Sequence, residues 1–137
     1  MVNFVTIWNN HPGFADLCDF SNQCAIRMGT ALMKSKIDMS SFGGVKCWDK
    51  EHKFLNHTLR AQELADWMAR EPNHFGNVDV VTKNTTYKDF TNRKGLVFFQ
   101  DGWGPTDHID IWNGSSMKAG AKNYFTKAKE VWFWDLP

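Results

Sequence analysis

A cysteine and a histidine are the residues of this 137-residue chain best placed to form a nucleophile. Cys24 stands in the stretch FSNQCAIRMG. Asp19, Ser21 and Asn22 before it are residue types that commonly cap the start of a helix. His108 lies much later, in DHIDIWN, which alternates like a strand. A thiolate beside an imidazolium is a strong nucleophile, and the two side chains need to be neighbours only in space.

The sequence leaves two interpretations of Cys24 open. Cys24 shares one face of the expected helix with Met28, Ala31 and Leu32, so it suits a small core residue. The same position also lies at the positive end of the helix dipole, which stabilises a thiolate. A helix terminus contributes about 0.3–1 kcal/mol, whereas converting an ordinary thiol into a thiolate at neutral pH takes roughly 3 kcal/mol. A catalytic Cys24 therefore needs an adjacent imidazolium.

The alternation in DHIDIWN assigns the strand residues to two faces. Ile109 and Ile111 share one face and suit a core, while His108, Asp110 and Trp112 share the other. We interpret this second face as a candidate functional face. A solvent-facing histidine and carboxylate are the simpler alternative.

The other histidines and the cysteines give weaker signals. His11, His52, His57 and His74 lie in expected loops or at helix starts, and we assign them no catalytic role. No Cys and His pair has the ligand spacing of a zinc site, so we expect no metal. Three cysteines are an odd number, and pairing Cys18 with Cys47 would leave Cys24 reduced, although the sequence does not fix the pairing.

Periodicity predicts an α+β fold in which helices precede an antiparallel sheet. Residues 1–20 are expected to be irregular or weakly helical. Residues 101–106, DGWGPT, are expected to connect two strands as a hairpin. The expected helices cover about 23–36 and 57–71, the latter capped by Thr58 and stopped by Pro72. The expected strands cover 78–81, 95–100, 107–113 and 131–136.

Composition excludes some classes of protein. Sixteen basic and 15 acidic side chains give a formal charge of +1, which argues against a nucleic-acid-binding protein. The apolar runs are too short to span a membrane, and the N-terminus has no Sec signal pattern. Aromatic residues make up 15% of the chain and include seven Trp, so we expect some of them to line a groove. Trp103, between two glycines, and Trp112 are our candidates, and a hydrophobic plug on the hairpin is the alternative for Trp103.

Several stretches, taken together and in order, resemble the type VI secretion amidase effectors of family four. They are QCAIRMG followed by ALMKSKIDM, then HTLRAQELADWM, GLVFFQDGWG and DHIDIWNG. The resemblance implies a papain-like fold related to the NlpC-type cell-wall peptidases, in one amidase domain over residues 1–137. It implies that Cys24 is the nucleophile and His108 its partner, with no cofactor.

The resemblance also implies a substrate and partners. The substrate is the peptide stem of peptidoglycan, cut between D-glutamate and meso-diaminopimelate. The protein is expected to leave the producing cell through the type VI secretion machinery, without a signal peptide, and to act in the periplasm of target bacteria. A cognate immunity protein is expected to block its active site.

The chain departs from this family at the third catalytic position. The family usually has an acidic residue in the stretch after the histidine, whereas residues 115–123, SSMKAGAKN, contain neither Asp nor Glu. Asp110 or Asn113 could orient the imidazole instead, the protein could work as a dyad, or this copy could be weakened. The alternative functions are a non-catalytic cell-wall-binding module and another papain-like acyl-transfer enzyme.

Overall fold

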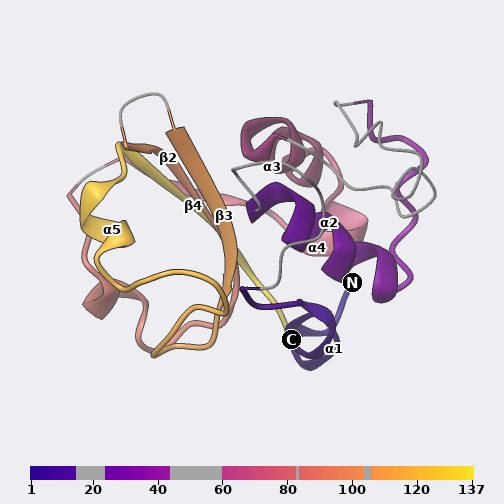
Figure 1. The fold of residues 1–137 in the computed structure, drawn as a ribbon, viewed down its shortest axis with the longest axis horizontal. Helices are drawn as coiled ribbons and strands as arrows, with labels where there is room; N and C mark the ends of the chain where they lie inside the picture. The colour runs from indigo at the N-terminus through magenta and orange to yellow at the C-terminus, as the bar shows by residue number, and fades with distance from the viewer. Residues whose placement is uncertain (15–23, 44–59, 83, 104–105) are drawn as a thin grey trace.

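A layer of helices covers one face of an antiparallel sheet, and shorter helical turns cover the other face (Figure 1). The computed structural model describes residues 1–137 except 15–23, 44–59, 83 and 104–105. The helices of the first layer are α1 (Phe4–Asn10), α2 (Cys24–Lys34), α3 (Ala61–Ala69) and α4 (Pro72–Phe75).

The sheet has four strands in the order β1-β4-β2-β3, and all its neighbours are antiparallel. The strands are β1 (Asp79–Val81), β2 (Gly95–Trp103), β3 (Thr106–Trp112) and β4 (Glu130–Asp135). Strand β3 therefore forms one edge of the sheet. The 3-10 turn η2 (Tyr87–Phe90) and α5 (Tyr124–Lys127) complete the second layer. The predicted α+β order, helices first and antiparallel strands second, is confirmed.

Both faces of the sheet are packed, which explains why consecutive apolar residues of β2, such as Val97 and Phe98, are both buried. Ile109 and Ile111 lie in the core shared with α2 and α3, as predicted. The opposite face forms a second core, in which Phe125 of α5 packs against Phe99 and Trp112. The residues around His108 therefore face packed protein and not open solvent.

Some predicted boundaries change. The helix predicted over 57–71 ends at Ala69, and Pro72 begins the separate helix α4, where a proline at the first position costs no intrahelical hydrogen bond. Thr58, the predicted cap, lies outside the described residues. The N-terminal stretch, which we expected to be irregular or weakly helical, contains the regular helix α1, and the Asn3 side chain caps it by accepting from the Val5 N–H.

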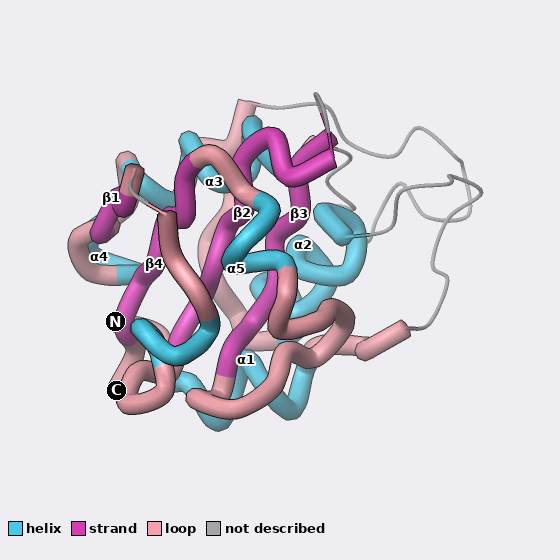
Figure 2. The backbone as a smooth tube through the Cα atoms, turned by 90° about the vertical axis from the view of Figure 1, so that its left-hand side faces the viewer, coloured by secondary structure: helices cyan, strands magenta, loops and turns pink. Residues whose placement is uncertain are grey.

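The predicted hairpin joins β2 and β3, which pair antiparallel with Phe99 opposite His108, but both strands extend into the connection predicted over 101–106, so that Trp103 pairs with Thr106. The register shifts between Phe99 and Trp103, where Asp101 adopts a φ of 53°. The two ends of the chain lie near each other (Figure 2), and the Phe4 N–H donates to the carbonyl of Pro137 at 2.9 Å. None of the described helices is long and apolar enough to span a membrane.

Candidate active site

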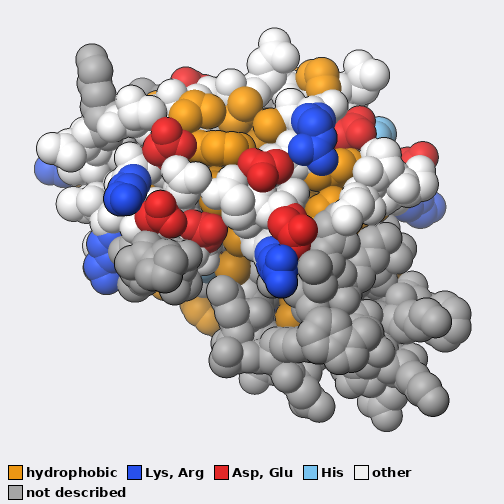
Figure 3. Space-filling view, turned by 90° about the horizontal axis from the view of Figure 1, so that it is seen from above, with side chains coloured by type: hydrophobic (Ala, Val, Ile, Leu, Met, Phe, Trp, Pro, Cys, Tyr) orange, Lys and Arg blue, Asp and Glu red, His pale blue; other side chains and the backbone are white. Residues whose placement is uncertain are grey.

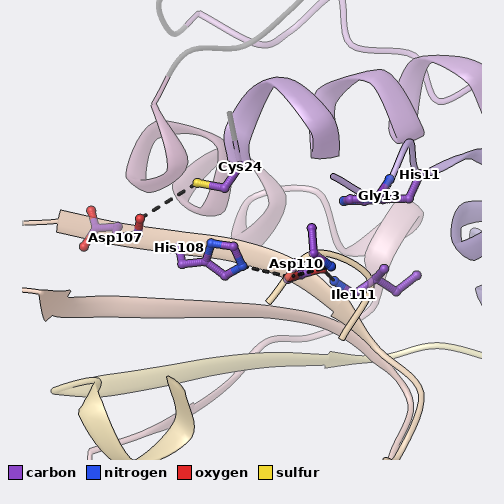
Figure 4. Close-up of polar contacts among 8 residues, drawn as sticks. His11, Gly13, Cys24, Asp107, His108, Asp110 and Ile111 are labelled. Carbon is purple, nitrogen blue, oxygen red and sulfur yellow. Dashed lines mark hydrogen bonds and ion pairs between the residues drawn. The ribbon is translucent and has the colours of Figure 1, made fainter. Parts of the chain in front are cut away.

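Cys24 is the first residue of α2 and lies against the edge strand β3 (Figure 4). Its Sγ is 3.8 Å from the carbonyl oxygen of Asp107. The side chain is only 4% exposed and belongs to the core between the helices and the sheet. Cys24 therefore combines both positions that the sequence suggested, since it is a packed core residue and also stands at a helix N-terminus.

His108 points toward the second core but also reaches Cys24. Its ring lies roughly parallel to Phe99 at 6.1 Å, and the ring of Tyr124 meets it nearly at a right angle at 4.9 Å. Its side chain also forms a hydrogen bond with Cys24. Because β3 is the edge strand of the sheet, no further described strand separates the imidazole from the start of α2.

Asp110 holds the other side of the imidazole. Its Oδ2 lies 2.7 Å from the Nε2 of His108, although the two residues share one face of the same strand (Figure 4). The carboxylate is fully buried and accepts backbone N–H bonds from Ile111 at 2.8 Å and from Ala119 at 3.2 Å to each oxygen. These bonds hold the carboxylate in the position in which it contacts the histidine. Because the Nε2 of His108 contacts Asp110, Nδ1 is the ring nitrogen available to Cys24.

The surroundings of His108 favour its protonated form. Burial alone would lower the pKa of this imidazole, but the hydrogen bonds with Asp110 and Cys24, and the negative charges of both, raise it from 6.5 to about 9. His108 is therefore an imidazolium at neutral pH, which is the partner that a thiolate needs.

His11 is a site neighbour to which the sequence analysis assigned no role. It is 4% exposed, and burial lowers its pKa to about 4 against the attraction of Asp110. Its Nδ1 accepts from the Gly13 N–H at 3.0 Å, while its buried Nε2 has no hydrogen-bond partner among the described residues. Its membership of a His-Pro-Gly turn made it look like an ordinary loop residue, and only its burial identifies it.

The remaining predicted site residues lie elsewhere. The Asn113 Oδ1 accepts from the backbone N–H groups of Ser115 and Ser116 at 2.9 and 2.7 Å, so this amide closes the turn after β3 and does not orient His108. The prediction that Trp112 lines a substrate groove is wrong. Its side chain is fully buried in the second core, and its indole N–H donates to the carbonyl of Phe90 at 2.9 Å.

Two other predictions concern side chains that the structure does not describe. Trp103 ends β2, but its side chain lies outside the described residues, so the proposal that it walls a groove stays a prediction. Cys18 and Cys47 lie outside them as well, and with them the question of a disulfide.

Carboxylates gather on the side of the site where Cys24 meets Asp107. Burial raises the pKa of Asp107, and the negative charges of Asp101 and Asp66 add to this effect, while a hydrogen bond from the Asp101 N–H opposes it. Figure 3 shows acidic and basic side chains set among apolar ones on the end of the molecule at the top of Figure 1. The carboxylates of Asp66 and Asp101 therefore lie close enough to Asp107 to disfavour its ionised form.

The sulfur, the imidazole and the carboxylate form one connected series of hydrogen bonds. Such an arrangement can generate a nucleophile, protonate a leaving group and later activate water, which is the chemistry of acyl transfer to a cysteine. Within the described part of the chain, no group of three His, Cys, Asp or Glu side chains could hold a metal ion.

Comparisons with known proteins identify the family and the fold of the chain. The model of the family described as "Type VI secretion system (T6SS), amidase effector protein 4" matches residues 20–134. No curated protein sequence matches the chain.

Solved structures share the fold over the whole chain. The effector Tae4 from Salmonella typhimurium, solved in complex with the immunity Tai4 from Enterobacter cloacae, is 20% identical with a TM-score of 0.77, over 100% of both chains. The Tae4-Tai4 complex from Enterobacter cloacae is 21% identical with a TM-score of 0.75, over 100% of this chain and 99% of that one. The type VI effector Tae4 from Enterobacter cloacae is 21% identical with a TM-score of 0.73, over 100% of this chain and 98% of that one.

Proposed function

Because this chain belongs to the Tae4 family of type VI secretion system amidase effectors, we propose that it cleaves peptidoglycan stem peptides between D-glutamate and meso-diaminopimelate. Cys24 acts as the nucleophile, His108 as the general acid and base, and Asp110 as the residue that orients His108. The observation that carries this proposal is the pair of hydrogen bonds made by His108, one to Cys24 and one to Asp110.

The first half of the reaction forms a thioester. Asp110 accepts a hydrogen bond from the Nε2–H of His108, so Nδ1 holds the proton that the Cys24 thiol has given up, and the resting pair is a thiolate and an imidazolium. The thiolate attacks the γ-carbonyl carbon of D-glutamate and gives a tetrahedral oxyanion. When this intermediate collapses, the imidazolium gives its Nδ1 proton to the leaving amine of meso-diaminopimelate, and the C–N bond breaks.

The second half hydrolyses the thioester. His108, now neutral, accepts a proton from water, and the resulting hydroxide attacks the same carbonyl carbon. The collapse expels the Cys24 thiolate beside the imidazolium and releases the γ-carboxyl group of D-glutamate, whose proton passes to the released amine or to solvent. Both oxyanions form at the start of α2, where first-turn N–H groups lack intrahelical partners and the helix dipole is positive, so the backbone N–H of Cys24 serves as one donor.

The proposed function includes partners and a place of action. The similar effectors Tae4 from Salmonella typhimurium and Enterobacter cloacae were solved in complex with Tai4 immunity proteins. By analogy, a cognate immunity protein binds this chain in the producing cell. The type VI secretion machinery delivers the chain, and the amidase acts on peptidoglycan in the periplasm of target bacteria.

Asp110 also weakens the main alternative. A cell-wall-binding module without catalysis was attractive because the stretch after His108 holds no acidic residue. A buried carboxylate 2.7 Å from the imidazole provides the third group from within the same strand. A protein that only binds would have no need for a buried imidazolium beside a thiol.

Digestion of purified sacculi tests the proposal. Wild-type protein and the variant Cys24→Ala are incubated with sacculi that contain meso-diaminopimelate, and the soluble products are weighed by mass spectrometry. We expect stem fragments that end in D-glutamate and others that begin with a free amine on meso-diaminopimelate, from the wild type only. Products cut at another bond would support another papain-like activity, and no wild-type product would refute the proposed reaction.

A further inference from the structure

We infer that Gly120 is a positioning residue of this active site, because the missing side chain at this position lets Asp110 and His108 close on each other. The inference rests on the proposed function only in that it takes Cys24, His108 and Asp110 as the catalytic group.

The backbone at Gly120 passes directly over the hydrogen bond between these two side chains. A Cβ atom built on Gly120 would lie 2.9 Å from the Oδ2 of Asp110 and 3.0 Å from the Nε2 of His108, the two atoms that form the bond. It would also lie 2.8 Å from the Cε2 of Tyr124. Real Cβ atoms essentially never come closer than 3.0 Å to another atom, so any side chain at position 120 must displace at least one of these groups.

The need for glycine here is one of space and not of backbone conformation. Gly13, Gly76 and Gly114 have positive φ angles of 66°, 75° and 98°, which L side chains rarely adopt. Gly120 is not among the positive-φ glycines of the described chain. Alanine therefore fits the backbone at this position, and only the contacts with the three neighbouring atoms oppose it.

Two neighbours of Gly120 in the sequence hold its backbone in place. The Ala119 N–H donates to both oxygens of Asp110 at 3.2 Å, so the carboxylate anchors the segment just before the glycine. Tyr124, four residues later, packs its ring against His108 and, at 6.0 Å, against Phe99. The segment therefore cannot retreat easily from an added methyl group.

The effect of the added methyl group depends on which of its neighbours it displaces. The backbone N–H groups of Ile111 and Ala119 hold the carboxylate, and the rings of Phe99 and Tyr124 hold the imidazole. A methyl group in the angle between them therefore lengthens the bond from Nε2 to Oδ2. This bond strengthens the basicity of His108, so lengthening it weakens the ion pair with Cys24.

The groups around His108 come from several elements. The charged ones are Cys24 of α2 and Asp110 of β3; the ring of Tyr124 of α5 packs against the imidazole, and the charge of His108 helps to lower the pKa of His11 after α1. Of the contacts made by His108, only the hydrogen bond to Asp110 has both of its atoms next to the missing side chain of Gly120. A change at position 120 therefore acts on His108 mainly through Asp110.

The test is the variant Gly120→Ala, read by titration of the His108 imidazole in NMR spectra and by the rate at which iodoacetamide alkylates Cys24. We expect the His108 midpoint to fall from about 9 to about 8 or below, and alkylation at pH 7 to slow by about tenfold. Gly43→Ala is the matched control, since a Cβ there meets nothing within 4 Å, and it should leave both readings unchanged.

A double-mutant cycle separates this positioning role from a general structural role. In the Asp110→Asn background the carboxylate is absent, so Gly120→Ala should change the His108 midpoint much less than in the wild type. Equal shifts in both backgrounds, or an unchanged midpoint in the single variant, would overturn the inference.

If Gly120→Ala gives no cooperative thermal transition, Tyr124→Ala provides room for the methyl group. The midpoint is then compared between Tyr124→Ala alone and the double variant, and equal values would overturn the inference. Neither reading requires peptidoglycan. If His108 responds to position 120 but no muropeptide is released, the proposed function fails and the positioning role stands.

Discussion

Replacing Asp110 by asparagine separates the carboxylate from the shape of its side chain. The amide oxygen can keep the bonds from the N–H groups of Ile111 and Ala119 at the Oδ1 position. The amide nitrogen then takes the place of Oδ2 and presents N–H donors to the Nε2 of His108. To accept from it, the imidazole must carry its proton on Nδ1, which is the nitrogen that receives the proton of Cys24.

The structure sets the size of the effect. The rise of the His108 pKa from 6.5 to about 9 corresponds to about 3 kcal/mol in favour of the imidazolium. Losing most of this stabilisation costs on the order of a hundredfold in turnover. The wrong tautomer adds to it, up to about four orders of magnitude in total, as for orienting carboxylates in other triads. A plain Cys24–His108 dyad would lose only about tenfold.

The assays are muropeptide release from sacculi and the pH profile of Cys24 alkylation. In Asp110→Asn, turnover should fall by about 10² to 10⁴, and the alkylation profile should move to higher pH because the imidazolium no longer supports the thiolate. Stability provides an independent reading. The raised pKa of His108 stabilises the wild type fully below pH 6.5, and this contribution is lost as the pH rises toward 9. The stability of Asp110→Asn should not fall in this way between pH 6.5 and 9.

Two controls keep the interpretation specific. Asp107→Asn removes the same charge from the same strand, but this carboxylate accepts from the Asp101 N–H and not from His108. Asn113→Ala removes only an amide that closes a turn. Both should retain turnover within about tenfold. Near-normal turnover and an unchanged alkylation profile in Asp110→Asn would refute the orienting role and leave a dyad of Cys24 and His108.

Four further predictions address the remaining residues. Cys24→Ala should abolish muropeptide release while keeping the circular dichroism spectrum, and release by this folded variant would end its role as nucleophile. Iodoacetamide at neutral pH should label Cys24 before Cys18 and Cys47 in the native protein, as peptide mapping would reveal, whereas the reverse order would mark Cys24 as an unactivated core thiol. Trp112→Phe should lower the free energy of unfolding, measured in urea, by about 1–3 kcal/mol, because this indole is buried and its N–H is hydrogen-bonded. The KM should change little. A raised KM at unchanged stability would instead indicate that Trp112 lines the substrate groove. The pKa of His11 falls to about 4 on folding, so the wild type should lose up to about 3 kcal/mol of stability as the pH falls from 6.5 to 4. The variant His11→Gln should lose less when both proteins are unfolded in urea at the two pH values. Equal losses would contradict this prediction.

Local patterns in the sequence determined the elements and the faces of the strands. The spacing around Cys24 predicts a helix over about 23–36, and alternation predicts that Ile109 and Ile111 face the core. These features depend on residues a few positions apart, because side-chain directions follow from helix and strand geometry alone. The α+β order follows from the same patterns.

The tertiary structure alone decided what the other face of β3 does. The sequence placed His108, Asp110 and Trp112 together but did not show that a second layer covers them, so Trp112 looked like a groove residue. The cover comes from η2 and α5, short elements whose few residues produce too little periodicity to predict.

The segment that follows β3 also determines which group contacts the imidazole of His108. Whether Asp110 can turn toward His108 depends on backbone N–H groups, one of them from Ala119, and on a glycine that leaves room at position 120. The contacts of Ala119 and Gly120 with Asp110 join residues on either side of a turn, and their geometry depends on how that turn packs against the sheet. Sequence therefore indicated which residues could react, and the three-dimensional packing decided which carboxylate contacts the histidine.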